Sequence, residues 1–408
     1  MSRPPEASLS TGPTAPGVGI AVSPHHLASA AGLEILEAGG TAVDAAIAVN
    51  AALGVVLPET CGPGGDLFAL VHRPGDDRPI TLNSSGRAGS GTTAEDLRDA
   101  GLGAIPYRSP WSITVPGCVD GWEALSDRFG ALPLSDVLAP AIRLATDGFV
   151  VSSELGGALV RIAELVEDQD SASELYPRGE PAAAGTVITR PRFAATLQGI
   201  ADSGRSAFYD GDVAAGIMEA SRGTITTDDL AVVQADWIEP AGLELFGRTA
   251  WTIPPNSQGY LTLATLAVFS QLDPPSDPND PLFTHLLIEA YRAVAWERAD
   301  TVGDPNTALV SVDELLAADR LANRASMVSR TGVTRWPTPV PQPGGTAYMT
   351  VLDGSGMGVS FIQSNFAGIG SGLSAGNTGV WLHNRGAGFN LIPGHPNEMI
   401  AGKRPLHT

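Results

Sequence analysis

Thr346 is the residue of this sequence whose type and position most suggest chemistry. It follows the segment PQPGG, residues 341–345, and opens the alternating segment TAYMTVLD. In one reading Thr346 is an ordinary first residue of a strand, and the local sequence alone favours this reading. In the other reading the chain breaks before Thr346. Its hydroxyl is then a nucleophile, and its freed α-amine is the base that such a weak nucleophile needs.

The elements around Thr346 are suited to that second role. Residues 331–345, TGVTRWPTPVPQPGG, predict an extended and exposed linker. Its last two residues, Gly344 and Gly345, let the backbone bend so that the Thr346 hydroxyl can reach the preceding carbonyl. TAYMTVLD, a turn at GSG and then MGVSFIQSN predict a β-hairpin that holds Thr346 rigidly. The segment GVWLHN predicts a further strand.

The N-terminal part of the chain predicts a layered core. After a short apolar strand, GIAVS, apolar side chains recur at helical spacing through residues 25–40. Thr41 and Asp44 have the spacing of a capping box, which opens a second helix over residues 42–56. That helix is apolar on nearly every side, so it must be buried within a layered domain.

Composition excludes several classes of function. The chain has 408 residues and a net charge of −20 with no local Lys or Arg cluster, so it repels phosphate backbones and we expect no nucleic-acid partner. It has no uninterrupted apolar run of about 18 residues, and its start, MSRPPEASLS, lacks the basic and apolar regions of a secretory signal. We therefore expect no membrane span and a cytoplasmic location. Cys61 and Cys118 are too few for a disulfide framework.

We expect no metal and no cofactor. The glycine-rich segment CGPGGD lacks the spacing of phosphate-binding loops. His383, His395 and His407 are spread over the C-terminal part of the chain without the spacing of metal ligands.

Landmarks spread over nearly all 408 residues resemble the γ-glutamyltransferase family of N-terminal-nucleophile hydrolases. The resemblance is carried, in order, by residues 25–70, SITVPGCVDGWEAL, DLAVVQADWIEP, PPNSQGY, GGTAYMTVLD, GSGLSAGNTGV and GKRPLHT. It implies an α+β fold of the αββα four-layer sandwich type. It also implies self-cleavage between Gly345 and Thr346, and transfer or hydrolysis of an amide acyl group through a Thr346 ester.

The same resemblance carries over to further site residues. Ser364 stands where the family has a Thr whose hydroxyl touches the nucleophile, so we expect Ser364 beside Thr346. Asn384 stands where the family keeps an Asn on a strand lining the site. Arg385 follows it, at a position where the family commonly has Gln or Glu. Both are candidate substrate contacts.

Two departures from the family concern the donor. The family grips the glutamyl α-carboxylate with an Arg at the position of Ser85, and it holds the α-ammonium with an Asp at the position of Gly388. Arg87 is a candidate replacement for the lost Arg, since it lies on the same strand face as Ser85 if the strand continues. Losing an ionic partner in a closed site costs about 1.5–3 kcal/mol. We therefore expect weak discrimination for the glutamyl zwitterion.

The predicted domain organisation follows from these landmarks. Residues 1–18 predict a disordered tail, 19–345 a large-subunit-like region that is mostly helical in its middle, and 346–408 the start of a small-subunit-like region. Together they make one composite domain. Family members continue past KRPL into a segment with paired glycines, so we expect the C-terminal part of the sandwich to be missing from this chain.

The expected function is γ-glutamyltransferase-like acyl transfer or hydrolysis on a small-molecule amide or peptide donor, as in glutathione metabolism. The enzyme would consist of the large and small fragments of its own precursor, with a homodimer of processed units as one arrangement. Two alternatives stay open. One is an amidase or acylase that acts on a non-glutamyl acyl group. The other is a catalytically silent or truncated relative.

Overall fold

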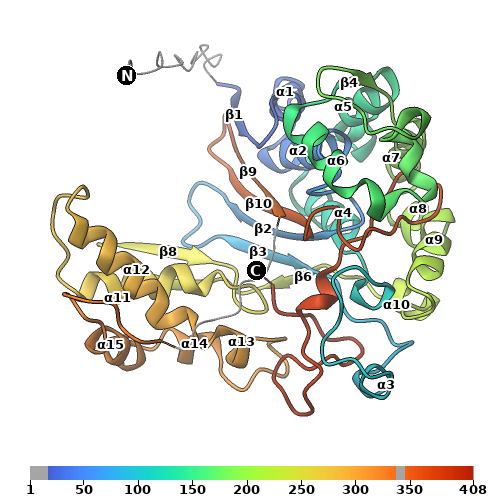
Figure 1. The fold of residues 1–408 in the computed structure, drawn as a ribbon. Helices are drawn as coiled ribbons and strands as arrows, with labels where there is room; N and C mark the ends of the chain where they lie inside the picture. The colour runs from blue at the N-terminus through green and yellow to red at the C-terminus, as the bar shows by residue number, and fades with distance from the viewer. Residues whose placement is uncertain (1–16, 337–344, 408) are drawn as a thin grey trace, which may run out of the picture.

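The protein is an α+β fold built around one large antiparallel sheet (Figure 1). The computed structural model describes residues 17–336 and 345–407. Most of the predicted tail, 1–18, and part of the predicted linker, 331–345, therefore lie outside the described residues. The sheet has six strands in the order β1-β9-β10-β2-β3-β6. Their bounds are β1 (Gly19–Val22), β2 (Asp66–His72), β3 (Ile80–Ser84), β6 (Asp236–Ile238), β9 (Gly345–Asp353) and β10 (Gly358–Phe366).

A helical layer covers one face of this sheet, and the predicted N-terminal helix pair forms its centre. Helix α1 (His26–Glu37) packs on α2 (Ala42–Val56), and α2 packs in turn on β9 and β10. The predicted capping box is confirmed, because Thr41 Oγ1 accepts a bond from the Asp44 amide at 3.2 Å and Asp44 accepts from the Thr41 amide at 2.9 Å. Every residue of α2 is buried, as its all-round apolar sequence predicts.

The remaining elements of the layer, in blue-green to green in Figure 1, extend this core. They include a second, two-stranded sheet. Their bounds are α4 (Cys118–Phe129), α5 (Leu134–Asp147), β4 (Phe149–Val150), α6 (Ser153–Val166), β5 (Val187–Ile188), α7 (Pro191–Ser203), α8 (Arg205–Tyr209), α9 (Asp212–Ala220) and α10 (Thr227–Ala231). Helix α3 (Ala94–Asp99) lies outside this layer and packs in a separate small apolar cluster with Phe389 and Met399. Short 3-10 turns occur at Pro110–Ser112, Asp170–Glu174, Pro177–Gly179 and Arg385–Gly388.

A second helical unit, yellow to brown in Figure 1, has its own apolar core. It begins with a hairpin, β7 (Ala241–Leu245) and β8 (Arg248–Thr252), on which α11 (Tyr260–Gln271) packs. The other helices of the unit are α12 (Pro281–Ala295), α13 (Arg298–Thr301), α14 (Val312–Leu315) and α15 (Ala318–Ser326). Side chains of α11 and α12 share a cavity with Phe68 of β2 and Ile362 of β10, so this unit stands against the sheet face opposite the α1–α2 layer.

The predicted hairpin is confirmed, and its register places polar residues at one end of the sheet. In β9 and β10, Ala347 pairs with Gln363 and Gly345 pairs with Phe366, with an irregularity between these pairs. On the other side of β10, Ser364 pairs with Asp66, the first residue of β2. Since side chains alternate across a strand, this register brings Thr346, Ser364 and Asp66 together on three neighbouring strands.

One predicted strand is wrong. The segment GVWLHN, residues 379–384, forms only an isolated bridge between Ser374 and Trp381. Its backbone groups bind loops instead of a neighbouring strand. The amide of His383, for example, donates to the carbonyl of Gly64 in the glycine-rich loop at 3.0 Å. Alternating apolar residues identify a buried extended segment, but they do not reveal whether a strand is available to pair with it.

The structure shows part of the predicted αββα four-layer arrangement. Within residues 17–336 and 345–407 the large sheet is accompanied only by the two-stranded β4–β5 and β7–β8 sheets, so a second large sheet is not among the described elements. None of the described helices is long and apolar enough to cross a lipid bilayer.

Candidate active site

Thr346 and Ser364 lie side by side at the end of the hairpin. Their hydroxyl oxygens are 3.1 Å apart. Ser364 Oγ donates to the carbonyl oxygen of Gly345 at 2.6 Å and accepts from the amide of Phe366 at 2.8 Å. Because Ser364 has one hydroxyl hydrogen and the carbonyl can only accept, the Thr346 hydroxyl must be the donor in the Thr346–Ser364 bond. The hydroxyl contact expected from the family resemblance is thus present in this geometry.

The two hydroxyls open onto a cavity of about 510 Å³ between the sheet and the α11–α12 pair. Such a volume is within the usual range for small-molecule sites. Thr346 itself is exposed, which leaves its hydroxyl accessible from the cavity. The lining residues are Asp66, Phe68, Leu70, Thr252, Ile253, Ser257, Gln258, Gly259, Leu261, Thr262, Thr265, Leu266, Leu287, Tyr291, Thr346, Ile362, Ser364, Arg385 and His407.

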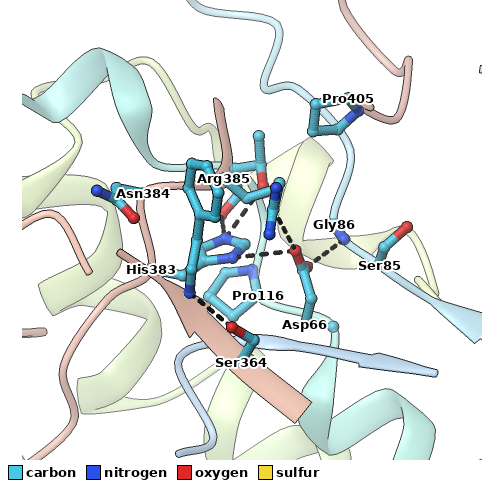
Figure 2. Close-up of polar contacts among 12 residues, drawn as sticks. Asp66, Ser85, Gly86, Pro116, Ser364, His383, Asn384, Arg385 and Pro405 are labelled. Carbon is cyan, nitrogen blue, oxygen red and sulfur yellow. Dashed lines mark hydrogen bonds and ion pairs between the residues drawn. The ribbon is translucent and has the colours of Figure 1, made fainter. Parts of the chain in front are cut away.

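Asp66 is the centre of a buried polar cluster behind this cavity (Figure 2). One of its oxygens accepts from the amide of Gly86 at 2.6 Å. The other lies 2.7 Å from His407 Nε2, 3.3 Å from His383 Nδ1 and 4.0 Å from Arg385 Nε. The carboxylate therefore faces groups from three separate segments of the chain, at Gly86, at His383 and Arg385, and at His407.

The hydrogen-bond partners fix how the two histidines act. His407 Nε2 lies 2.7 Å from the Asp66 carboxylate, which can only accept, so its proton lies on Nε2 and Nδ1 is left to accept from the side-chain amide of Asn256 at 3.2 Å. His383 Nε2 donates to the carbonyl of Thr114 at 2.9 Å. His407 thereby orients Asp66 through a hydrogen bond, whereas His383 Nδ1 faces Asp66 at 3.3 Å without one.

Burial and charge shift the pKa values of this cluster. Burial acts to raise the pKa of Asp66, but the nearby His383 and His407 outweigh it and hold that pKa far below the usual range of an aspartate. Burial lowers the pKa of His407 to about 4, with the charge of Arg385 acting in the same direction. Burial also lowers the pKa of Arg385 to about 10, so Arg385 stays a cation at neutral pH. The resting site holds a carboxylate, a guanidinium and a neutral His407.

The low pKa of His407 predicts a pH-dependent stability. Its pKa is about 4 in the folded chain against 6.5 in the unfolded chain, so its contribution is complete above pH 6.5 and is lost as the pH falls through about 4. Between about pH 7 and about pH 4.5 we expect a loss on the order of 2 kcal/mol that His407→Asn largely removes. Urea unfolding at both pH values measures it. The exposed His72→Asn serves as control, and equal pH slopes for wild type and His407→Asn would contradict the expectation.

The side chains of Ser85 and Arg87 turn away from the cavity. Ser85 Oγ donates to Asn83 at 2.7 Å and accepts from Arg404 at 3.3 Å. Strand β3 ends at Ser84, so the argument that Arg87 shares a strand face with Ser85 is wrong. Arg87 instead pairs with Asp236 at 2.5 Å, and neither it nor Ser85 lines the cavity.

The neighbours Asn384 and Arg385 have different surroundings. The Asn384 side chain accepts from the amide of Ala367 at 3.0 Å and donates to the carbonyl of Tyr107 at 3.0 Å. In Figure 2 it points away from Asp66, and it does not line the cavity. Arg385 does line the cavity, where its guanidinium stacks 3.6 Å from the centre of the Phe366 ring. Their predicted roles in substrate contact remain predictions.

The sequence did not predict that Asp66, His383, Arg385 and His407 lie together in one cluster. Its members come from positions 66, 383, 385 and 407, and no spacing rule connects residues so far apart. The available signal was that the glycine-rich segment CGPGGD ends in a carboxylate at the first residue of a strand. Among the described residues no group of three or more His, Cys, Asp or Glu side chains is arranged to hold a metal ion.

Comparison with known proteins places this chain in a family. Residues 28–408 match the family model described as gamma-glutamyltranspeptidase. The chain is 36% identical to the glutathione hydrolase-like YwrD proenzyme of Bacillus subtilis, covering 95% of this chain and 74% of that protein. It is 38% identical to the oxamate amidohydrolase proenzyme of Klebsiella pneumoniae, covering 96% of this chain and 75% of that protein.

Solved structures of related enzymes have a similar fold to this chain. A cephalosporin acylase from Bacillus halodurans superposes with a TM-score of 0.89 at 33% identity, covering 100% of this chain and 77% of that chain. Because the family match runs through residue 408, these comparisons do not support the expectation that part of the sandwich is missing. The chain belongs to the gamma-glutamyltranspeptidase family, and it is an acyl-transferring or hydrolytic enzyme of that family.

Proposed function

We propose that this protein cleaves itself between Gly345 and Thr346, and that the product hydrolyses or transfers the acyl group of an amide through a Thr346 ester. The observation that carries the proposal is the chain of bonds from the Thr346 hydroxyl to Ser364 and from Ser364 to the Gly345 carbonyl oxygen, at 3.1 and 2.6 Å. The proenzyme names of the relatives support it. The family's αββα sandwich and a homodimer of processed units remain part of the same proposal.

The bond chain provides a route for the proton in self-cleavage. As Thr346 Oγ1 attacks the carbonyl carbon of Gly345, its proton passes to Ser364 Oγ, and the Ser364 proton passes to the Gly345 oxygen. The neutral ring that forms collapses as the Gly345–Thr346 C–N bond breaks and the proton of the ring hydroxyl passes to the departing nitrogen, which leaves an ester on Thr346. Water hydrolyses that ester to a Gly345 carboxylate and a Thr346 residue with a free α-amine. The relay needs no separate charged base.

The mature reaction uses the same hydroxyl. The freed α-amine of Thr346 takes the hydroxyl proton as the oxygen attacks a substrate amide, and it returns that proton to the leaving amine. The acyl group is then held as an ester on Thr346. Water or a second amine resolves the ester, which gives hydrolysis or transfer. The cavity of about 510 Å³ beside Thr346 is the space in which the acyl group lies.

A second candidate concerns the donor, and one observation favours it. Recognition of a γ-glutamyl group requires an acid for its α-ammonium. Among the described residues Asp66 is the one carboxylate that lines the cavity, and its oxygens already face Gly86, His383 and His407. This favours amides whose acyl group lacks an α-ammonium. The relatives named as oxamate amidohydrolase and cephalosporin acylase support a non-glutamyl donor as well.

The test compares γ-glutamyl-anilide with glutaryl-anilide, which lacks only the amino group. We expect the two values of kcat/KM to lie within about tenfold, because no described carboxylate in the cavity is free to bind the ammonium. A preference for the glutamyl donor above roughly a hundredfold, about 2.7 kcal/mol, would reveal an ammonium partner and return the assignment to γ-glutamyl donors. No turnover of either compound, with a single band on a denaturing gel, is the result that a catalytically silent relative would give.

A further inference from the structure

Phe366, the last residue of β10, has a backbone conformation that its residue type does not favour. Its φ is +75°, in the left-handed region that glycine and asparagine adopt readily and that a bulky side chain disfavours. Within the described residues four other non-glycine residues have a positive φ, and all four are exposed: Arg178, Arg222, Phe246 and Asp273. Phe366 is buried, with 1% of its surface exposed. A buried residue in this conformation must be held there by its surroundings, and such residues gather at functional sites.

The Phe366 ring packs against two other side chains. The Arg385 guanidinium lies 3.6 Å from the centre of the ring. The Tyr107 ring stacks on it with the two ring centres 5.5 Å apart and the planes 27° from parallel. These contacts favour the position of the ring and so offset the unfavourable backbone angle.

The backbone is also anchored on both sides of Phe366. The amide of Asn365 donates to the carbonyl of Thr60 at 3.0 Å. The amide of Ala367 donates to the side-chain oxygen of Asn384 at 3.0 Å. With both neighbours fixed, the peptide group between Asn365 and Phe366 can turn only if the dihedral angles of these two residues change. The left-handed angle of Phe366 therefore helps to fix the direction of its own amide.

That amide binds Ser364. It donates to Ser364 Oγ at 2.8 Å, at the point where the pairing of β9 with β10 becomes irregular. The same oxygen accepts from the Thr346 hydroxyl at 3.1 Å and donates to the carbonyl of Gly345 at 2.6 Å. A hydroxyl has two acceptor positions and one hydrogen, so the Ser364 hydroxyl is fully used and has a single orientation. Without the Phe366 amide one acceptor position is unoccupied, and the hydroxyl can turn its hydrogen away from Gly345.

We propose that Phe366 is a positioning residue for the Thr346 reaction: its left-handed backbone keeps its amide on Ser364 Oγ, and this amide keeps the Ser364 hydrogen directed at the Gly345 carbonyl. The inference rests on the proposed function, because it concerns the proton route of the same site. Phe366 does not line the cavity and takes no part in bond breaking. Its effect should therefore appear in the rate of self-cleavage.

The experiment changes backbone preference and side-chain packing in opposite directions. Phe366→Asn removes the ring and favours the left-handed region, whereas Phe366→Ile keeps an apolar side chain and strongly disfavours that region. Each proenzyme is made by cell-free synthesis, and the uncut chain is followed with time on a denaturing gel. We expect Phe366→Asn to cleave within about threefold of the wild-type rate and Phe366→Ile to be slower by about tenfold or more. A role in packing alone predicts the reverse order.

Phe246 provides the matched control. It also has a positive φ, +53°, but it lies in the turn between β7 and β8 and is 68% exposed. Phe246→Asn and Phe246→Ile should leave the cleavage rate unchanged. Phe366→Gly, which adopts the left-handed region without strain, replaces Phe366→Asn if that variant does not fold. Equal slowing by Asn and Ile at position 366, or no slowing by Ile, would overturn the inference.

Failure of the inference can be told apart from failure of the proposed function. Cleavage by wild type with the reverse order of variants defeats the positioning role alone, whereas a wild type that stays a single chain defeats the proposed function. In that case hydrogen exchange at the Phe366 amide, measured by NMR with ¹⁵N-labelled phenylalanine, still decides. We expect Ser364→Ala to speed this exchange by about fivefold or more and to leave that of Phe361, in the same strand, unchanged. Equal exchange at Phe366 in both proteins would overturn the inference.

Discussion

A Thr346→Ala variant is expected to remain a single chain of 42.0 kDa and to lack measurable amidase activity. Both results follow from one atom, because Oγ1 is the nucleophile of self-cleavage and of the later acyl transfer. Removal of a nucleophile that acts with its base typically lowers kcat by about 10⁶-fold. A denaturing gel, N-terminal sequencing and an anilide assay measure the outcome. The smaller fragment of wild type should begin Thr-Ala-Tyr-Met.

Thr350→Ala is the matched control for this variant. Thr350 lies four residues further along β9, on the same strand face, and its hydroxyl donates to the carbonyl of Val359 at 3.0 Å. It should cleave and turn over like wild type. Thr346→Ser keeps a hydroxyl and should still cleave. A fragment that begins at any other residue, or activity in Thr346→Ala, would contradict the assignment of the nucleophile.

Local sequence patterns predicted the scaffold around Thr346 well. The capping box at Thr41, the buried helix α2 and the hairpin of β9 and β10 all occur as expected, because each depends on residues close in sequence. The failed strand at residues 379–384 depends on a partner that no local pattern specifies. The same limit applies to Arg87, whose predicted position assumed that β3 continues past Ser84.

Local sequence could connect the residues of the candidate site only where they lie on one hairpin, and Arg385 was named through the family resemblance alone. Thr346 and Ser364 are joined by strand register, so a short segment of sequence contains both. Asp66, Arg385 and His407 meet because β2 pairs with β10 and because two C-terminal loops fold over that edge. Such a convergence is decided by tertiary packing. The cleavage point at residues 345 and 346 and the two-region organisation around it stay predictions.

The contribution of Asp66 to the stability of this cluster can be measured directly. Asp66→Asn replaces a buried carboxylate that faces Arg385, His383 and His407 with a neutral amide. The guanidinium of Arg385 then loses its negative neighbour in a site where it is almost fully buried. Removing one partner of a buried ion pair costs about 3–5 kcal/mol, so we expect a destabilisation of that size in urea unfolding of the single-chain Thr346→Ala protein.

Asp236→Asn is the control variant that shows how much of the destabilisation is due to burial of the carboxylate. Asp236 binds two guanidiniums, those of Arg87 and Arg404, but its side chain is 47% exposed, whereas that of Asp66 is 3% exposed. Because water screens an exposed pair, Asp236→Asn should cost about 1 kcal/mol or less. Adding Arg385→Met to Asp66→Asn should restore part of the lost stability, since it removes the buried cation that the Asp66 carboxylate faced. If Asp66→Asn and Asp236→Asn destabilise the protein equally, burial of the Asp66 carboxylate is not what makes it central to the site.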